Sequence, residues 1–293
     1  MTASLREIAP SGSALQAALL RRMLQLLLKP AFHPDRPIAD QRRRVDLLGG
    51  IQPLPRGVRR EAATGGEWLH PAQVTSPGSV LYLHGGAYCV GSPRSHRALT
   101  ARIARAMGRP VFVADYRLAP EHPWPAAQED ALAAFAVLPA PVVITGDSAG
   151  GGLALLTAMA LRGLGGPQPA ALWLMSPWVD MAPWPAAPAG EAMLSDAWGQ
   201  ACAGHVLAGQ DAAQLSPLHA DLRGLPPVLL QFGTDEALHD QGQALHRALA
   251  AAGVPVQTEV YARRWHVFQL HAGQLRSADA ALASAADFLR HGR

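Results

Sequence analysis

The sequence predicts an α/β fold in which helices flank a mostly parallel β-sheet. Short apolar runs of strand length alternate with segments of helical length from residue 79 onward, and this alternation is typical of parallel sheets covered on both faces. A β-hairpin is expected earlier, from Val58 to His70, because two glycines in Thr64-Gly65-Gly66 permit the positive φ of a tight turn. The chain has 293 residues, 49% of them hydrophobic, so it can bury a large core.

Each element of the alternation is placed by its apolar pattern. The expected strands are residues 79–83, 110–114, 142–145, 170–175, 227–232 and 256–261. The expected helices are residues 96–107, 126–137, 151–161, 239–252 and 275–289. Residues 1–50 are expected to be helical, apart from a loop at 29–34. The irregular segment 181–212 interrupts the alternation, and because long insertions at strand ends lie where ligands bind, we expect it to form a lid.

Composition excludes several classes of protein. The 25 basic and 22 acidic side chains give a net charge of +3, partly concentrated in Arg42-Arg43-Arg44, so a nucleic-acid partner has little support. Arg21 and Arg22 interrupt the apolar stretch from Ala14 to Leu28, which leaves no signal core or membrane span. We expect a cytoplasmic protein whose amphipathic first helix packs on the body, contact with lipid being the alternative.

The two cysteines indicate neither a metal site nor a redox motif. Cys89 and Cys202 lie far apart in the sequence, without metal-binding spacing. Reduced thiols are therefore expected, as in most cytoplasmic proteins. We expect no metal and no organic cofactor.

A candidate nucleophile lies in Gly146-Asp147-Ser148-Ala149-Gly150. The β-branched run 142–145 precedes this pentapeptide and a Gly- and Leu-rich helical segment, 151–161, follows it. This strand, turn and helix order is the context in which G-x-S-x-G forms a nucleophile elbow, since only small flanking residues let strand and helix approach so closely. Ser148 is the predicted nucleophile.

An oxyanion hole is predicted from the segment that follows the strand 79–83. There His84-Gly85-Gly86-Ala87-Tyr88 contains paired glycines, whose N–H groups can turn toward an anion without interference from a Cβ. The N–H of the residue after the nucleophile would complete the hole. We therefore assign it to Gly85, Gly86 and Ala149.

The catalytic base is expected to be a histidine late in the chain, after the acid. His266 follows the last expected strand, and His271 is the substitute candidate.

The acid is expected at the end of a neighbouring strand, where a buried carboxylate would orient the imidazole. Asp235 is preferred because its strand adjoins the one that leads to His266. Glu236 and Asp240 are near alternatives, and Asp180, after the preceding strand, is the other contender.

Together these motifs resemble the hormone-sensitive-lipase-like carboxylesterases of the α/β-hydrolase fold, in the branch with Gly-Asp-Ser-Ala-Gly. The shared segments are residues 84–88, 115–127, 146–150, 176–178, 233–236 and 266–268. The resemblance implies an eight-stranded sheet in a catalytic body of residues 51–180 and 213–293, with residues 1–50 and 181–212 as a helical cap. It also favours Asp235 as the acid. Ala87 departs from the third glycine that many members carry.

The function expected from this resemblance is hydrolysis of short- to medium-chain acyl esters through an acyl-enzyme. Tyr88, Trp178, Trp184 and Trp198 are expected to line the substrate pocket. Hydrolysis of a lactone, or of an acetyl group on a small natural product, uses the same catalytic groups, and a small-molecule binding protein is the non-enzymatic alternative. The expected partner is a small-molecule ester, and a homodimer is possible.

Overall fold

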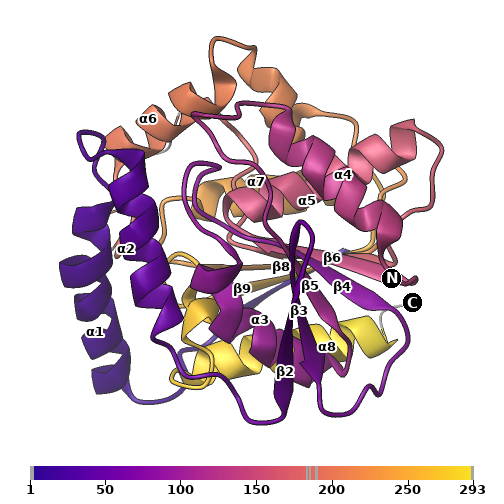
Figure 1. The fold of residues 1–293 in the computed structure, drawn as a ribbon, viewed down its shortest axis with the longest axis horizontal. Coiled ribbons are helices and arrows are strands. Elements are labelled where there is room, and N and C mark those ends of the chain that lie inside the picture. Colours follow the sequence, from indigo (N-terminus) through magenta and orange to yellow (C-terminus); the bar gives the residue numbers. More distant parts are fainter. Residues whose placement is uncertain (1–2, 183, 185, 189–190, 292–293) are drawn as a thin grey trace.

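The computed structural model of the protein describes residues 3–182, 184, 186–188 and 191–291. A nine-stranded sheet crosses the molecule in the order β1-β9-β8-β7-β6-β4-β5-β3-β2, as Figure 1 shows. The first seven strands in this order, β1-β9-β8-β7-β6-β4-β5, run parallel to one another, whereas β3 pairs antiparallel with both β5 and β2. The fold class predicted from the sequence is confirmed.

The strands and helices have the following bounds. The strands are β1 (Ser4–Ile8), β2 (Val58–Ala63), β3 (Gly66–Pro71), β4 (Ser79–Leu83), β5 (Val111–Ala114), β6 (Val142–Asp147), β7 (Ala171–Met175), β8 (Val228–Gly233) and β9 (Val256–Tyr261). The α-helices are α1 (Ala14–Met23), α2 (Ile38–Gly50), α3 (Pro93–Met107), α4 (Ala126–Val137), α5 (Ala149–Gly163), α6 (Asp196–Leu207), α7 (His239–Ala251) and α8 (Arg276–His291). A π-helical turn, η1 (Leu24–Leu28), continues α1.

The expected helices, strands and hairpin are found close to their predicted bounds, but two predictions were wrong. Residues 1–50 are not wholly helical, because β1 forms a parallel edge strand on β9 with Ser4 opposite Gln257. The sheet therefore has nine strands and not eight. The side chain of Arg6 on β1 forms an ion pair with the buried carboxylate of Glu259, which joins the N-terminal strand to the body.

Helices cover both faces of the sheet (Figure 1). Helices α3 and α8 lie on one face, and α4, α5 and α7 lie on the other. Helices α1 and α2 both lie at one side of the sheet, and α6 lies above them in this view. Of the segment 181–212, residues 183, 185, 189 and 190 lie outside the described part of the chain.

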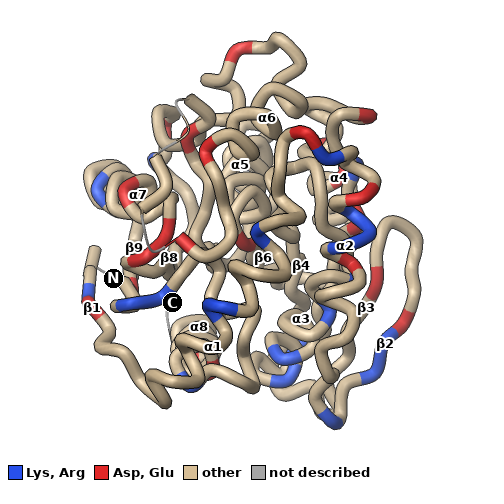
Figure 2. The backbone as a smooth tube through the Cα atoms, turned by 90° about the vertical axis from the view of Figure 1, so that its left-hand side faces the viewer, with Lys and Arg blue, Asp and Glu red and all other residues tan. Residues whose placement is uncertain are grey.

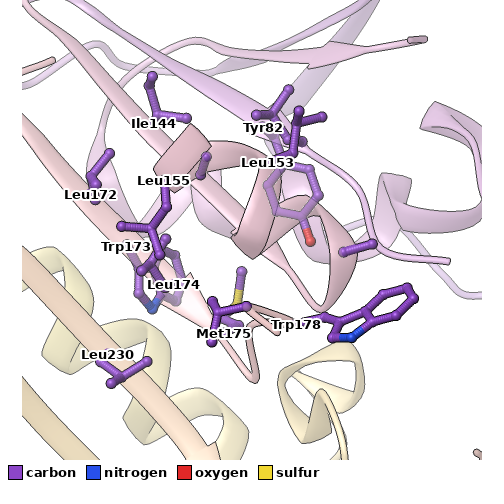
Figure 3. Close-up of a cluster of buried hydrophobic side chains, with 14 of the residues drawn as sticks. Tyr82, Ile144, Leu153, Leu155, Leu172, Trp173, Leu174, Met175, Trp178 and Leu230 are labelled. Carbon is purple, nitrogen blue, oxygen red and sulfur yellow. The ribbon is translucent and has the colours of Figure 1, made fainter. Parts of the chain in front are cut away.

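The core lies on both faces of the central strands. Figure 3 shows Trp173 and Leu174 of β7, Leu230 of β8 and Leu155 of α5. All four side chains are fully buried. The indole N–H of Trp173 donates to Gln231 Oε1 over 3.0 Å, so the one polar atom of this side chain is satisfied inside the core.

Replacing Trp173 with alanine should destabilise the protein strongly. The change removes a buried indole and leaves a cavity, which costs about 3–5 kcal/mol of unfolding free energy. Urea unfolding followed by circular dichroism measures this loss. Val137→Ala, at a position 79% exposed, is the control and should change the unfolding free energy by less than about 0.5 kcal/mol. Equal effects of the two variants would contradict the placement of the core.

Candidate active site

Ser148 lies on a strained turn between β6 and α5. Its φ of 52° and ψ of −121° are unfavourable for a residue with a side chain. The turn is held by a hydrogen bond of 2.9 Å from its N–H to the carbonyl of Met175. A Cβ added at Gly150 would lie 2.0 Å from the carbonyl oxygen of Leu83, and one at Gly146 would lie 2.4 Å from the carbonyl of Gly150. The flanking glycines are therefore required sterically, as in a nucleophile elbow.

Asp147 joins this turn to its surroundings through a buried carboxylate. Its Oδ1 accepts hydrogen bonds from the Tyr82 hydroxyl (2.6 Å) and from the Gly85 N–H (3.0 Å). Its Oδ2 lies 3.5 Å from Nε2 of His96 on α3. One carboxylate thus connects β4, the loop after β4, and α3 to the residue before the nucleophile.

The surrounding groups keep this carboxylate ionised. Burial alone would raise the pKa of Asp147, but His96 and the Tyr82 hydroxyl together lower it below its ordinary value. Burial alone would lower the pKa of His96, and Asp147 reverses that effect and raises it. The two groups therefore favour a charged pair inside the protein.

The loop after β4 lines the cavity next to Ser148, but the backbone N–H groups that are free there are not all those predicted for an oxyanion hole. Gly85 was expected to donate to an oxyanion, yet its N–H is engaged by Asp147 Oδ1. The next residues, Gly86 with a φ of 120° and Ala87 with a φ of 52°, line the same cavity as Ser148. Within the described chain, the N–H groups of Gly86, Ala87 and Ala149 have no backbone or side-chain acceptor.

The carboxylate beside His266 belongs to Glu236. Oε1 of Glu236 lies 3.6 Å from Nδ1 of His266, and both side chains are buried. Oε2 of Glu236 accepts hydrogen bonds from the Ser176 hydroxyl and the Gly233 N–H, each over 2.8 Å. Burial alone would lower the pKa of His266, but Glu236, aided by more distant carboxylates, raises it above its ordinary value. Catalytic hydrogen bonds are often long before substrate binds, so 3.6 Å is compatible with a base and its acid.

Asp235 does not contact His266. The prediction that Asp235, and not Glu236, lies beside this imidazole was therefore wrong. Its carboxylate accepts a hydrogen bond of 2.7 Å from the guanidinium of Arg21 on α1 and another from Thr234. The side chain of Asp235 is 28% exposed. Two adjacent residues of this loop therefore point their carboxylates in different directions: Asp235 faces Arg21 of α1, and Glu236 faces the imidazole of His266.

The other candidates for acid and base lie elsewhere. Asp180 accepts from Nε2 of His219 over 3.0 Å, at the surface. Asp240 lies in the first turn of α7. His271 is buried against Trp265, and burial lowers its pKa to about 4. No carboxylate offsets this effect of burial, whereas Glu236 does so for His266.

Ser148 and His266 open onto one cavity of about 350 Å³. The predicted substrate residues Trp184 and Trp198 line it, whereas Tyr88 and Trp178 do not belong to its wall in the described structure. Both of these side chains are buried, with Trp178 packed edge-on against Trp184 at 4.9 Å between ring centroids. The remaining wall is mostly apolar and comes largely from the N-terminal segment, through Leu20, Met23, Leu24, Leu27, Leu28, Phe32, Val45 and Leu48.

Two further polar side chains near Glu236, for which the sequence predicted no role, are Ser176 and Glu191. Ser176, which donates to Glu236, also accepts from the Val267 N–H over 3.1 Å, so it joins the loops of acid and base. Glu191, which precedes α6 in the sequence, is buried and accepts a hydrogen bond from the N–H of Ala237 over 2.8 Å. Ser176 lies in a segment, 176–178, that the sequence had already singled out, whereas no sequence pattern pointed to Glu191.

Two negative findings complete the site. In the described part of the chain, no cluster of three His, Cys, Asp or Glu side chains is arranged to hold a metal ion. No described helix has both the length and the apolar content needed to cross a bilayer.

Comparison with known proteins places this arrangement in a family. A family model described as the α/β-hydrolase fold matches residues 80–270. An acetyl-hydrolase from Streptomyces hygroscopicus is 42% identical over 76% of this chain and 79% of its own length. An esterase from Acinetobacter venetianus is 33% identical over 94% and 93% of the two chains. A crystal structure of an esterase from the bacterial hormone-sensitive lipase family superposes with a TM-score of 0.87 at 35% identity, covering 96% of this chain and 99% of that one.

The chain therefore belongs to the hormone-sensitive lipase family of esterases, which are serine hydrolases with the α/β-hydrolase fold. The resemblance seen in the sequence motifs is confirmed, and so is the expected activity, carboxylic ester hydrolysis.

Replacing Asp147 with alanine should destabilise the fold more than replacing it with asparagine. Alanine leaves Tyr82, Gly85 and His96 without their shared partner, and removing one member of a buried charged pair costs about 3–5 kcal/mol. Asparagine keeps an acceptor for the first two. Because the pKa of Asp147 is lowered by folding, its carboxylate stabilises the protein above the ordinary Asp pKa, and this contribution disappears as the pH falls through the lowered value.

Urea unfolding at pH 7 and at acidic pH measures both effects. The advantage of the wild type over Asp147→Asn should shrink toward acidic pH. A difference that grows on acidification would contradict the ionised state assigned to Asp147.

Proposed function

We propose that Ser148, His266 and Glu236 form the catalytic triad of this esterase. His266 takes the proton of the Ser148 hydroxyl as its oxygen attacks the ester carbonyl, and then gives that proton to the leaving alcohol. Water releases the acyl group in the second half of the reaction, with His266 again as base. The observation that carries the proposal is a strained serine on the same cavity as a buried imidazole whose other ring nitrogen faces a buried carboxylate.

The oxyanion is proposed to be bound by the N–H groups of Gly86, Ala87 and Ala149. Each is free of an acceptor within the described structure, and Gly86 and Ala87 line the cavity beside Ser148. Ala149 is the first residue of α5, where the helix dipole also favours negative charge. Such donors contribute roughly 2.7–4 kcal/mol each to transition-state stabilisation.

The substrate is proposed to be an uncharged ester with a short to medium acyl chain. Apolar side chains dominate the cavity wall, and Asp147, the one carboxylate among the described residues of the wall, is already engaged by hydrogen bonds. Burying a charged substrate group without a partner there would be costly. Removal of an acetyl group from a small natural product is the second candidate, favoured by the similarity to an acetyl-hydrolase. A lactone remains a third possible substrate.

The cap is proposed to consist of residues 1–50 and 181–212, with residues 51–180 and 213–293 as the catalytic body. The lining of the cavity by Leu20 and Leu24 on one side and by Met193 and Trp198 on the other supports this division. The strand β1 within the first segment belongs to the sheet, so the cap proper would begin at α1.

A cytoplasmic location and a small-molecule substrate as the main partner are also proposed. Cys89 and Cys202 are buried, free thiols, which suits a reducing compartment. Figure 2 shows both basic and acidic residues on one side of the molecule, and the small net charge of +3 also argues against a nucleic-acid partner. A homodimer remains a proposal of the sequence analysis.

Replacing Ser148 with alanine should abolish hydrolysis of p-nitrophenyl butyrate. Loss of the nucleophile in a triad typically lowers kcat by about 10⁶-fold. Release of p-nitrophenol measures turnover, and a fluorophosphonate probe should label the wild type at Ser148 but leave the variant unlabelled. An unchanged rate would reject the assignment of the nucleophile.

Glu236→Gln should lower kcat by about 10³- to 10⁴-fold, as removal of a triad acid does elsewhere. In the wild type, kcat/KM should fall as the pH drops through the pKa of His266, which Glu236 holds above the ordinary histidine value, because only the neutral imidazole accepts the serine proton. In Glu236→Gln this acidic limb should move to lower pH. Asp235→Asn is the matched control and should keep its acidic limb where the wild type has it. The reverse pattern would make Asp235 the acid.

A further inference from the structure

Arg21 and Asp235 contact each other, and neither residue takes part in the proposed triad. Arg21 lies in the last turn of α1, and its Nη2 donates to Asp235 Oδ2 over 2.7 Å and to the carbonyl of Arg263 over 3.2 Å. The same guanidinium lies 5.5 Å from the ring centroid of Trp265, within the range of a cation–π contact. One cap side chain therefore contacts both loops that follow β8 and β9.

These contacts reach the immediate neighbours of the catalytic residues. Asp235 precedes Glu236, and Trp265, which is fully buried, precedes His266. The two loops are also joined to each other, because the Asp235 N–H donates to the Arg264 carbonyl over 2.9 Å. Movement of α1 would therefore be transmitted to the acid and the base together.

Helix α1 has few other means of staying in place. Only Ala17 and Leu20 are buried along its length, while Leu15, Leu19 and Met23 are exposed by 70%, 57% and 55%. A helix with so little buried apolar surface gains little from packing. Its polar contacts with the body therefore decide how often it is docked.

The position of α1 also determines the shape of the cavity. Leu20 and Met23 line the cavity that Ser148 and His266 share. Arg21 lies between these two residues in the sequence, and its side chain points toward the catalytic loops through its bond to Asp235. Docking of α1 thus completes the acyl-binding wall at the same time as it supports the base.

We propose that Arg21 is a positioning residue, whose ion pair with Asp235 latches the cap over the active site and couples substrate binding to the alignment of Glu236 and His266. The inference rests on the proposed triad. Side chains of Arg21 and Asp235 are 23% and 28% exposed, so the pair can open to solvent and close again while the fold stays intact. The latch is thus a reversible contact between α1 and the loops that follow β8 and β9.

The test compares Arg21→Met, Asp235→Asn and their double variant with Arg22→Met. Arg22 is the matched control, because it is the next residue on α1, is exposed, and has no side-chain partner in the described structure. We expect Arg21→Met and Asp235→Asn each to lower kcat/KM for p-nitrophenyl hexanoate by about three- to tenfold, mainly through a higher KM. The double variant should lose no more than Arg21→Met alone, because Arg21→Met already removes the contact with Asp235.

Further readouts separate a latch from a general loss of stability. Deuterium uptake by residues 14–28 should rise in Arg21→Met and Asp235→Asn but not in Arg22→Met, while urea unfolding midpoints stay close to the wild type. Loss of activity should be smaller for p-nitrophenyl acetate, whose acyl group is too short to need the cap wall. Arg21→Lys, which retains the charge, should recover part of the activity.

The outcomes distinguish this inference from the proposed triad. Two results would overturn the latch even when Glu236→Gln is inactive. One is a loss of kcat/KM in the double variant equal to the product of the two single losses. The other is an effect of Arg21→Met no larger than that of Arg22→Met. Full activity of Glu236→Gln would instead overturn the triad. In that case a raised KM and raised deuterium uptake in Arg21→Met would still show that the pair holds the cap.

Discussion

The carboxylate of Asp147 connects the parts of the site that come from different strands. It lies next to Ser148 in the sequence, accepts a hydrogen bond from the loop that carries the free amides, and faces His96 on α3. An ionised group in the protein interior is stable only when its partners satisfy it. One buried charge therefore fixes the loop after β4 relative to Ser148, and it also engages the Gly85 N–H.

A similar arrangement holds the proposed acid. Glu236 is held through one oxygen by Ser176 and Gly233, which leaves the other oxygen free to face His266. Ser176 also accepts a hydrogen bond from the backbone N–H of Val267, so one hydroxyl joins Glu236 to the loop that carries His266. In the proposed triad, neighbouring residues would thus orient the acid and the base before an ester enters.

Much of this could be predicted from the sequence, and the exceptions have physical reasons. The strand and helix alternation and the turn that carries Ser148 followed from local patterns, and chain order pointed to His266, which lines the same cavity as Ser148. The choice between Asp235 and Glu236 could not be predicted in this way. The direction in which the backbone turns each of two adjacent carboxylates cannot be read from the sequence, and Arg21, the partner of Asp235, lies far away along the chain. The strand β1 was missed because so short a segment becomes a strand only by pairing with β9, at the other end of the chain.

That pairing has a consequence for the stability of the molecule in concentrated solution. The residues of β9 are almost all buried, and an open edge there would expose a long row of unpaired backbone groups to other molecules. The strand that covers it is only five residues long and mostly exposed, with Arg6 and Glu7 at its centre. Short charged edge strands disfavour association between sheets, and this N-terminal strand, which completes the sheet, has both properties.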